Sequence, residues 1–273
     1  MKETDAGTHV YADVDRGHDT GNRAREDGMV DAACTEFYRD NGYLLVKGLL
    51  SKDEAEAYRR ECHALIGRLR PSDPTWGSAR AMSGGAATEL RHCHDVQYYC
   101  AAFARLLVDE RFTEVAAALL GTENVQLHHT KVFVKPAEKG SPFPMHQDAA
   151  HFPHTRHTLG AAVFHFDDAP EEKGCLRMVP GSHRRGPLPH VEAGGWHLPP
   201  AEWPLESAVP VEAEAGDVVF FSYLTVHGSG VNRSAQARTT LLVQFRDPRD
   251  QPVGDVHRSR GQGMMLRGHD PTL

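Results

Sequence analysis

The strongest chemical signal in the sequence is a histidine and a carboxylate two residues apart, His146 and Asp148. If this run ends a strand, the two side chains point to the same face and converge on one point. Such a pair is two thirds of the 2-His-1-carboxylate triad that holds non-heme iron and leaves coordination positions open. Alone the pair is weak evidence, because the chain has 18 histidines and an isolated H-x-D motif is more often part of a solvated loop.

A second motif supplies a third ligand. The segment HGSGVNRS starts at His227, after an Ala-Gly-Asp turn at 215–217 and a predicted strand over 218–221. His227 is far from the first pair in sequence, so the fold must bring it near. We expect His146, Asp148 and His227 to bind the metal and to be the catalytic centre.

Two further residues of this region could bind a carboxylate. Ser229 shares a face with His227 if the segment is extended, and Arg238 lies across a short turn before the strand predicted at 239–245, where a hairpin would set it alongside His227. A guanidinium with a neutral donor beside it suits the far carboxylate of 2-oxoglutarate, whose other end chelates iron. Taken alone, Arg238 would fit a surface salt bridge.

The elements that must position these residues change character along the chain. We expect helices over 31–40, which stops at Asn41-Gly42, and from the N-cap Ser51 with a capping box to Glu54 through residue 69. A short strand lies between them at 43–46, and a loop covers 71–88. Helical stretches follow at 98–108 and 113–120, with Arg91, His92 and His94 in the helical portion. Strands are predicted near 125–135, 159–166, 174–179, 209–213, 217–223, 225–229 and 239–246. Helices followed by short strands favour a mainly β fold with flanking helices.

Composition excludes several classes of function. The 273 residues carry 30 Lys and Arg against 37 Asp and Glu, a net charge of −7, which argues against nucleic-acid and anionic membrane partners. No apolar run approaches the roughly 18 residues of a membrane span. The five cysteines show no CxxC motif, which argues against a disulfide framework or a structural zinc site. The N-terminus has no apolar leader, so we expect a cytoplasmic protein.

The sequence predicts one domain over 29–273 and a disordered arm over 1–28, which is polar and has no helical or strand period. No signal addresses the oligomeric state.

The order of motifs resembles the phytanoyl-CoA dioxygenase family. It runs from H-x-D at 146–148 through GCLR at 174–177 and PGSH at 180–183 to A-G-D, HGSGVNRS and the arginine eleven residues after the second histidine, within a likeness over about 31–248. The resemblance implies a double-stranded β-helix, a cupin-like jelly roll, and an Fe(II)-, 2-oxoglutarate- and O2-dependent hydroxylase. It implies His146, Asp148 and His227 as iron ligands and Arg238 and Ser229 on 2-oxoglutarate. His129 stands where the family often has a glutamine, and we expect it to bind the cofactor.

The segment after H-x-D, with His151 and Phe152, often borders the site in this fold. Together with Lys131 and Arg246 these residues form the expected substrate site, for a small polar or anionic metabolite, the latter with a phosphonate, phosphate or carboxylate, or for a natural-product intermediate. A polar surface loop is the competing interpretation of the segment. The ectoine hydroxylases of the family have a Phe/Glu/Thr/Trp-rich stretch here, which Ala-Ala-His-Phe does not match. No Lys/Arg-rich patch favours an acyl-CoA.

Two other functions fit the same residues. A non-catalytic jelly-roll sensor of a metal or small acid should lose a ligand or the arginine, and all five positions are intact. A metal-dependent hydrolase would not need Arg238 with Ser229 and would act without O2.

Overall fold

Two sheets, antiparallel except at one edge strand, face each other in the computed structural model, which describes residues 11–13, 30–68, 88–192, 196–254 and 259–273. The larger sheet has the strand order β1-β2-β9-β6-β11-β4-β12, with β3 also paired to β4. The smaller sheet has the order β5-β10-β7-β8. The strands are β1 Tyr11–Asp13, β2 Tyr43–Lys47, β3 Arg91–His94, β4 Val125–Lys135, β5 Phe143–His146, β6 Gly160–His165, β7 Leu176–Met178, β8 Val209–Val211, β9 Val218–Ser222, β10 His227–Ser229, β11 Arg238–Arg246 and β12 Met265–Arg267.

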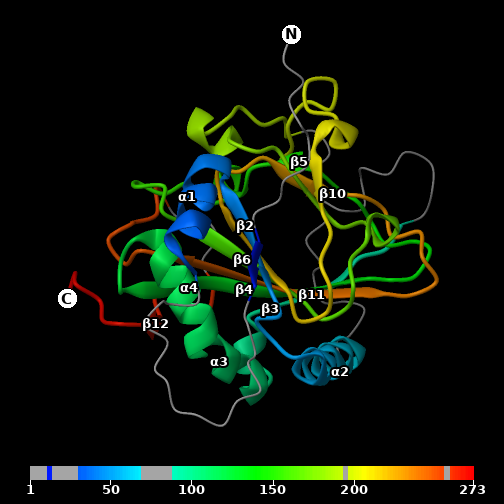
Figure 1. Cartoon of the computed structure of the whole chain (residues 1–273), viewed down its shortest axis with the longest axis horizontal. Coiled ribbons are helices and arrows are strands. Elements are labelled where there is room, and N and C mark those ends of the chain that lie inside the picture. The colour runs from blue at the N-terminus through cyan, green and yellow to red at the C-terminus, as the bar shows by residue number, and fades with distance from the viewer. Residues whose placement is uncertain (1–10, 14–29, 69–87, 193–195, 255–258) are drawn as a thin grey trace.

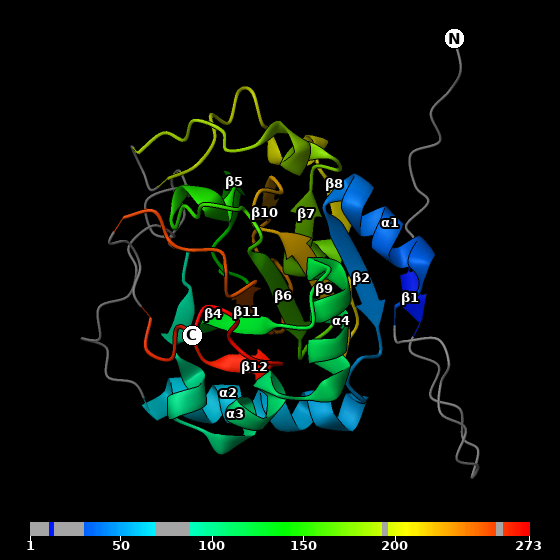
Figure 2. The ribbon, with the colours of Figure 1, turned by 90° about the vertical axis from the view of Figure 1, so that its left-hand side faces the viewer.

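The described α-helices cover the outer side of the larger sheet. They are α1 Ala32–Asn41, α2 Lys52–Arg68, α3 Ala101–Leu107 and α4 Glu110–Leu120. Figure 1 gives the arrangement, and Figure 2 shows β5, β7, β8 and β10 on one side of the larger sheet with α2 and α3 on the other. The mainly β architecture with flanking helices confirms the fold class expected from the sequence.

Strand alternation divides the interior into two cores. On β11, Leu241, Val243 and Phe245 face outward and pack with helix residues such as Phe112 in one apolar cluster. The opposite face of the larger sheet meets the smaller sheet, where Val163 and Leu176 belong to a second cluster. The functional side chains lie on this inner face, because residues two apart on a strand share a face.

Local sequence signals set the ends of the first helices, and the Gly42 stop and the capping box at Ser51 were expected. The Asp31 side chain accepts from the Cys34 N–H at 2.8 Å at the start of α1. The helix ends at Gly42, whose φ of +81° is accessible without strain only to glycine, and a Cβ there would lie 2.4 Å from His183. Ser51 and Glu54 form the predicted capping box. The Ser51 N–H donates to the Glu54 carboxylate at 2.7 Å, and the Glu54 N–H donates to the Ser51 hydroxyl at 3.1 Å.

Three parts of the chain differ from the sequence reading or extend it. Residues 91–94 form strand β3 instead of belonging to a helix, because their ladder partner β4 is available. Residues 265–267 form β12 at the edge of the larger sheet. Tyr11–Asp13, inside the arm expected to be disordered, pair in parallel with β2. The rest of that arm lies outside the described residues, so the prediction for it stays a prediction.

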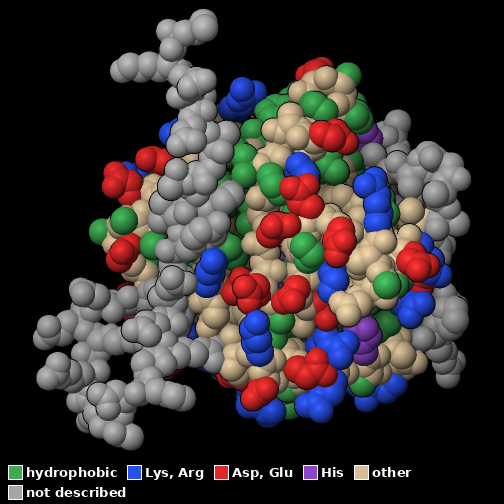
Figure 3. All heavy atoms as spheres, turned by 45° about the vertical axis from the view of Figure 1, so that its right-hand side comes forward, with side chains coloured by type: hydrophobic (Ala, Val, Ile, Leu, Met, Phe, Trp, Pro, Cys, Tyr) green, Lys and Arg blue, Asp and Glu red, His purple; other side chains and the backbone are tan. Residues whose placement is uncertain are grey.

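The surface charge and the lengths of the helices bear on whether nucleic acids or membranes are partners. On the face in Figure 3, acidic and basic side chains of the described residues are interspersed, with no broad area of one sign. Among the described helices, none is long and apolar enough to cross a membrane.

The capping box of α2 yields a first prediction, because Glu54 also binds Arg111 at 2.9 Å. The hydrogen bond from Arg111, outweighing partial burial, lowers the pKa of the Glu54 carboxyl from 4.5 to about 2. A depressed pKa stabilises the fold above the unfolded value, and this contribution is lost as the pH falls from 4.5 towards 2. The carboxyl is 39 % exposed, so we expect Glu54→Ala to lower the free energy of unfolding by about 1 kcal/mol at pH 7.

Denaturant unfolding at several pH values measures this difference, which should shrink in acid. Glu56→Ala is the matched control, since Glu56 is an exposed residue of the same helix, paired with Arg59 at 2.7 Å. Equal losses for the two variants, or a Glu54→Ala difference that does not change with pH, would contradict the assignment.

Candidate metal centre

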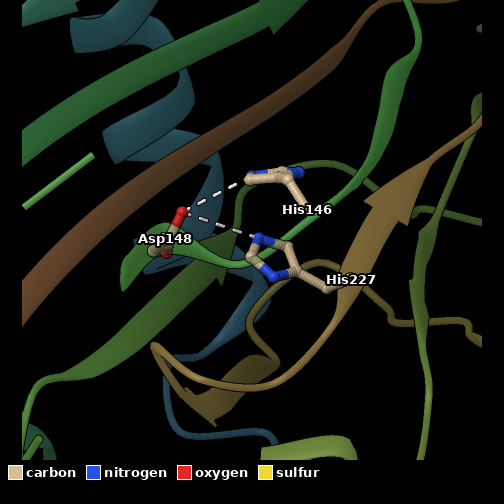
Figure 4. A group of neighbouring side chains, drawn as sticks. All are labelled: His146, Asp148 and His227. Carbon is tan, nitrogen blue, oxygen red and sulfur yellow. Dashed lines mark ion pairs between the residues drawn. The ribbon is translucent and has the colours of Figure 1, made fainter. Parts of the chain in front are cut away.

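Two histidines of the centre come from neighbouring strands of the smaller sheet. His146 is the last residue of β5 and His227 the first of β10, and the two are direct partners in the antiparallel register. Their ring centroids are 4.2 Å apart. Asp148 lies two residues beyond β5, at the start of a 3₁₀ turn over Asp148–Ala150. Figure 4 shows the three side chains pointing towards one another.

The three side chains form a compact group of ligand atoms. Asp148 Oδ1 lies 3.5 Å from His146 Nε2 and 3.8 Å from His227 Nε2. One ligand atom from each residue lies within 4.8 Å of the others. The same carboxylate oxygen therefore faces both imidazoles, as a shared metal ion requires.

Hydrogen bonds around the group fix its orientation. The Nδ1–H of His146 donates to the Pro144 carbonyl at 2.8 Å, and that of His227 to the Thr225 carbonyl at 2.9 Å. Because a carbonyl only accepts, Nδ1 carries the hydrogen and Nε2 presents its lone pair to the centre. Gln244 Nε2 on β11 donates to the other oxygen of Asp148, Oδ2, at 2.6 Å.

Burial and mutual attraction set the protonation of the group. Burial alone would raise the pKa of Asp148, but His227 and His146 lower it to about 2. Burial, with the nearby His146, lowers the pKa of His227 to about 4. For His146 the burial effect is outweighed by the hydrogen bond and charge of Asp148, which raise its pKa. A carboxylate and two Nε2 atoms held in this way fit the donor set of a non-heme iron site.

A cavity of about 90 Å³ extends from the metal centre between the two sheets. Its lining includes all three metal-site residues together with Ser229 and Arg238. The other walls are mainly apolar and come from both sheets: Phe133, Phe143, Val163, Leu176, Phe221, Gly228, Thr240 and Leu242.

Arg238 brings a buried positive charge to this cavity. It is 4 % exposed, and burial lowers its pKa to about 10, so it stays charged at neutral pH. Its Nη1 donates to the Gly174 carbonyl, whereas its buried Nε has no hydrogen-bond partner among the described residues. An unpaired buried donor is unfavourable, so the cavity suits an anionic group such as the far carboxylate of 2-oxoglutarate.

Two details of the sequence reading were wrong. Asp148 is not on the strand that carries His146, because the chain leaves β5 and enters the 3₁₀ turn, which still directs the carboxylate to the histidines. Arg238 does not form a hairpin with His227, because β10 pairs with β5 and β7 in the smaller sheet while β11 pairs with β4 and β6 in the larger. The guanidinium reaches the cavity from the opposite sheet.

His129 has neighbours that were not foreseen. Its Nδ1 lies 2.8 Å from Nδ1 of His128, and its ring centroid lies 5.5 Å from that of Phe152. It faces Gln244 across the β4–β11 ladder, but it is not among the described residues that line the cavity. A role for His129 in cofactor binding stays a prediction.

The four residues expected at the substrate differ in their surroundings. The ring centroids of His151 and His146 are 6.2 Å apart, and the Phe152 ring contacts His128 in a tilted arrangement and His129 edge-on. Lys131 Nζ lies 4.8 Å from the ring centroid of Phe133, a cavity residue.

Arg246 instead holds the loop that follows β11. Its Nε donates to Gln126 Oε1 at 3.0 Å, and its Nη1 donates to the Asp250 carbonyl. These bonds explain its burial without a substrate.

Sequence reasoning missed two side chains next to the site, Gln244 and Lys135. Lys135 Nζ donates to Ser229 Oγ at 2.7 Å. Both lie on the inward-facing positions of long strands, where polar residues alternate with the apolar ones of the outer core. That alternation is the signal that could have found them.

Comparison with known proteins identifies the family. The model of the family described as phytanoyl-CoA dioxygenase matches residues 38–240. A protein named probable alpha-ketoglutarate-dependent hypophosphite dioxygenase, from Stutzerimonas stutzeri, is 28 % identical over 219 residues, which cover 76 % of each chain. The peroxisomal phytanoyl-CoA dioxygenase of Rattus norvegicus is 31 % identical over 236 residues, 77 % of this chain and 66 % of the rat protein.

A solved structure agrees with this assignment. The epimerase SnoN, in complex with Fe3+, alpha ketoglutarate and nogalamycin RO, is 25 % identical, with a TM-score of 0.68 over 86 % of this chain and 98 % of its own. The jelly-roll fold expected from the resemblance is thereby confirmed. The chain belongs to the phytanoyl-CoA dioxygenase family of non-heme, 2-oxoglutarate-dependent enzymes.

Proposed function

We propose that this chain is an Fe(II)- and 2-oxoglutarate-dependent dioxygenase that hydroxylates an aliphatic carbon of a small, anionic metabolite or natural-product intermediate. The observation that carries the proposal is one cavity with a His-Asp-His group at one end and a buried guanidinium within its lining. A dicarboxylate whose one end binds the metal and whose other end meets Arg238 matches both features.

The residues of the chain divide the work of the reaction. Bound iron with 2-oxoglutarate and O2 supplies the oxidant that replaces a substrate hydrogen by hydroxyl, while 2-oxoglutarate becomes succinate and CO2. His146, Asp148 and His227 hold the metal from one side and leave other positions open. Gln244 holds Asp148 Oδ2, so that Oδ1 alone faces the imidazoles. The apolar walls exclude water from the cofactor.

An anionic substrate is favoured by the basic groups beside the metal centre. Burial lowers the pKa of Lys131 to about 8, opposed by attraction to Asp148, so the ammonium is largely charged at neutral pH. His151 lies beside His146, and Phe152 gives an apolar surface next to His129. A carboxylate, phosphonate or phosphate could be held by Lys131 with His151 as a neutral donor.

An anaerobic titration tests the proposal. Fe(II) and then 2-oxoglutarate are added to the purified apoprotein, and the weak visible metal-to-ligand band of the chelate is followed. Admission of O2 should then give succinate slowly, and faster with a substrate present. Failure of the iron-loaded protein to develop the band would contradict the proposal. Turnover of a substrate without O2 would favour the hydrolase, and tight 2-oxoglutarate binding without any succinate would favour the sensor.

Asp148→Ala should remove the metal site without unfolding the protein. We expect iron-dependent succinate formation to fall more than about 100-fold. Loss of a residue that only hydrogen-bonds a metal ligand already lowers metal affinity or activity by about 10–100-fold, and Asp148 is itself a proposed ligand. Asp40→Ala is the control, because Asp40 is an exposed carboxylate of α1. Wild-type turnover in Asp148→Ala would refute the assignment of the ligand.

Arg238→Ala should act on the cofactor and not on the metal. A charge-assisted hydrogen bond contributes about 1.5–3 kcal/mol, so the KM for 2-oxoglutarate should rise by about 10- to 100-fold. Iron binding, measured separately by metal analysis after desalting, should remain. An unchanged 2-oxoglutarate requirement would exclude Arg238 from the cofactor seat.

Lys131→Met tests the charge of the substrate. Succinate formation is compared with an anionic pool of small alkyl phosphonates, alkyl phosphates and dicarboxylates and with a neutral or zwitterionic pool that contains L-proline. We expect the anionic pool to accelerate wild-type turnover, and Lys131→Met to raise the KM for its active member about tenfold. Lys139→Met, which alters an exposed lysine paired with Glu89, should behave as wild type. Preference for the neutral pool, or no effect of Lys131→Met, would exclude the anionic site.

A further inference from the structure

A fully buried lysine lies directly behind the proposed cofactor seat. Lys135 is the last residue of β4 and the direct cross-strand partner of Arg238. Lys135 is 0 % exposed and Arg238 4 %. Burial, together with the charge of Arg238 directly opposite, lowers the pKa of the Lys135 amine well below its usual value.

No carboxylate of the described residues lies within 4.0 Å of the side-chain nitrogens of Lys135 or Arg238 as an ion-pair partner. The nearby acidic group is Asp167, which attracts Arg238 from a distance. Its Oδ2 accepts from the Thr239 N–H at 2.9 Å, and its Oδ1 lies 3.8 Å from Arg59 Nε. The buried guanidinium of Arg238 therefore has no close counter-charge in the described part of the protein.

The contacts of Lys135 lead to the cavity through one hydroxyl group. Its Nζ donates to Ser229 Oγ at 2.7 Å and to the Gly230 carbonyl at 2.6 Å, and it lies 5.4 Å from the ring centroid of Phe143. Ser229 lines the cavity, whereas Lys135 is not among its described lining residues. Because Nζ supplies a hydrogen to Oγ, the hydroxyl can direct its own hydrogen to a ligand in the cavity.

We infer that Lys135 is a positioning residue for the far carboxylate of 2-oxoglutarate. It orients the Ser229 hydroxyl as a donor into the cavity. The inference rests on the proposed function.

A double-mutant cycle tests the route through Ser229. The dissociation constant of 2-oxoglutarate is measured anaerobically from the visible band of the Fe(II) protein for wild type, Lys135→Met, Ser229→Ala and the double variant. We expect about a tenfold rise for Lys135→Met, and a double variant little weaker than Ser229→Ala alone, because residues that act through one another are not additive. Lys139→Met is the control with unchanged binding.

Two further readouts separate positioning from a purely structural role. At saturating 2-oxoglutarate, kcat of Lys135→Met should be close to that of wild type, so the effect lies in KM. The Tm of its apoprotein should be equal to or above that of wild type, because an apolar side chain of similar volume replaces a fully buried amine. Lys135→Gln, which keeps a donor but no charge, gives the same comparison if Lys135→Met does not fold.

The outcomes distinguish the inference from the function beneath it. A wild-type protein that loads iron but forms no band overturns the proposed function. A wild-type protein that binds 2-oxoglutarate while Lys135→Met binds it equally well overturns the inference. Fully multiplicative effects in the double variant, or a lowered apoprotein Tm with unchanged binding, also overturn it.

Discussion

The antiparallel register of β5 and β10 is the constraint on which the metal centre depends. It sets His146 directly opposite His227, so the ladder hydrogen bonds of a sheet fix the distance between two ligands. The carbonyls of Pro144 and Thr225 then turn both Nε2 atoms to the same point. Only the carboxylate is placed by other means, a short turn and a hydrogen bond from Gln244 in the opposite sheet. A one-residue slip of this register would move a histidine to the other face and abolish the site.

Charge is distributed unevenly along the cavity. Near the metal centre, Asp148 is a buried carboxylate whose pKa is lowered to about 2 by its histidine neighbours. Elsewhere in the lining, the cation Arg238 has no ion-pair partner among the described residues, and its pKa is lowered by burial. A metal cation and a dicarboxylate complement these two charges, so the free protein carries electrostatic strain that binding relieves. The same logic explains why the remaining walls are largely apolar, since they strengthen every interaction inside.

Much of this arrangement could be read from the sequence because the motifs are local. The capping box at Ser51 and the glycine stop at Gly42 depend on neighbouring residues and were predicted with their partners. The strand pairing was not predictable in the same way. The chain changes sheets between β10 and β11, which no turn residue announces, so Arg238 was placed near His227 for the wrong reason. Gln244 carries no motif, and its importance depends on a contact with a residue 96 positions away.

The lengths of the strands have a consequence for motion. β4 and β11 have 11 and 9 residues and pair over most of their length, whereas β5, β7, β8 and β10 have only three or four each. Local opening is therefore expected to begin in the smaller sheet, which has fewer ladder hydrogen bonds to break. That sheet carries both histidines. The larger sheet carries Gln244, which binds Asp148, and Arg238, which is proposed to bind the far carboxylate of 2-oxoglutarate. A metal ion held by His146, Asp148 and His227 would join β5 to β10 within the less persistent sheet, and amide hydrogens of these two strands should exchange with solvent more slowly once it binds.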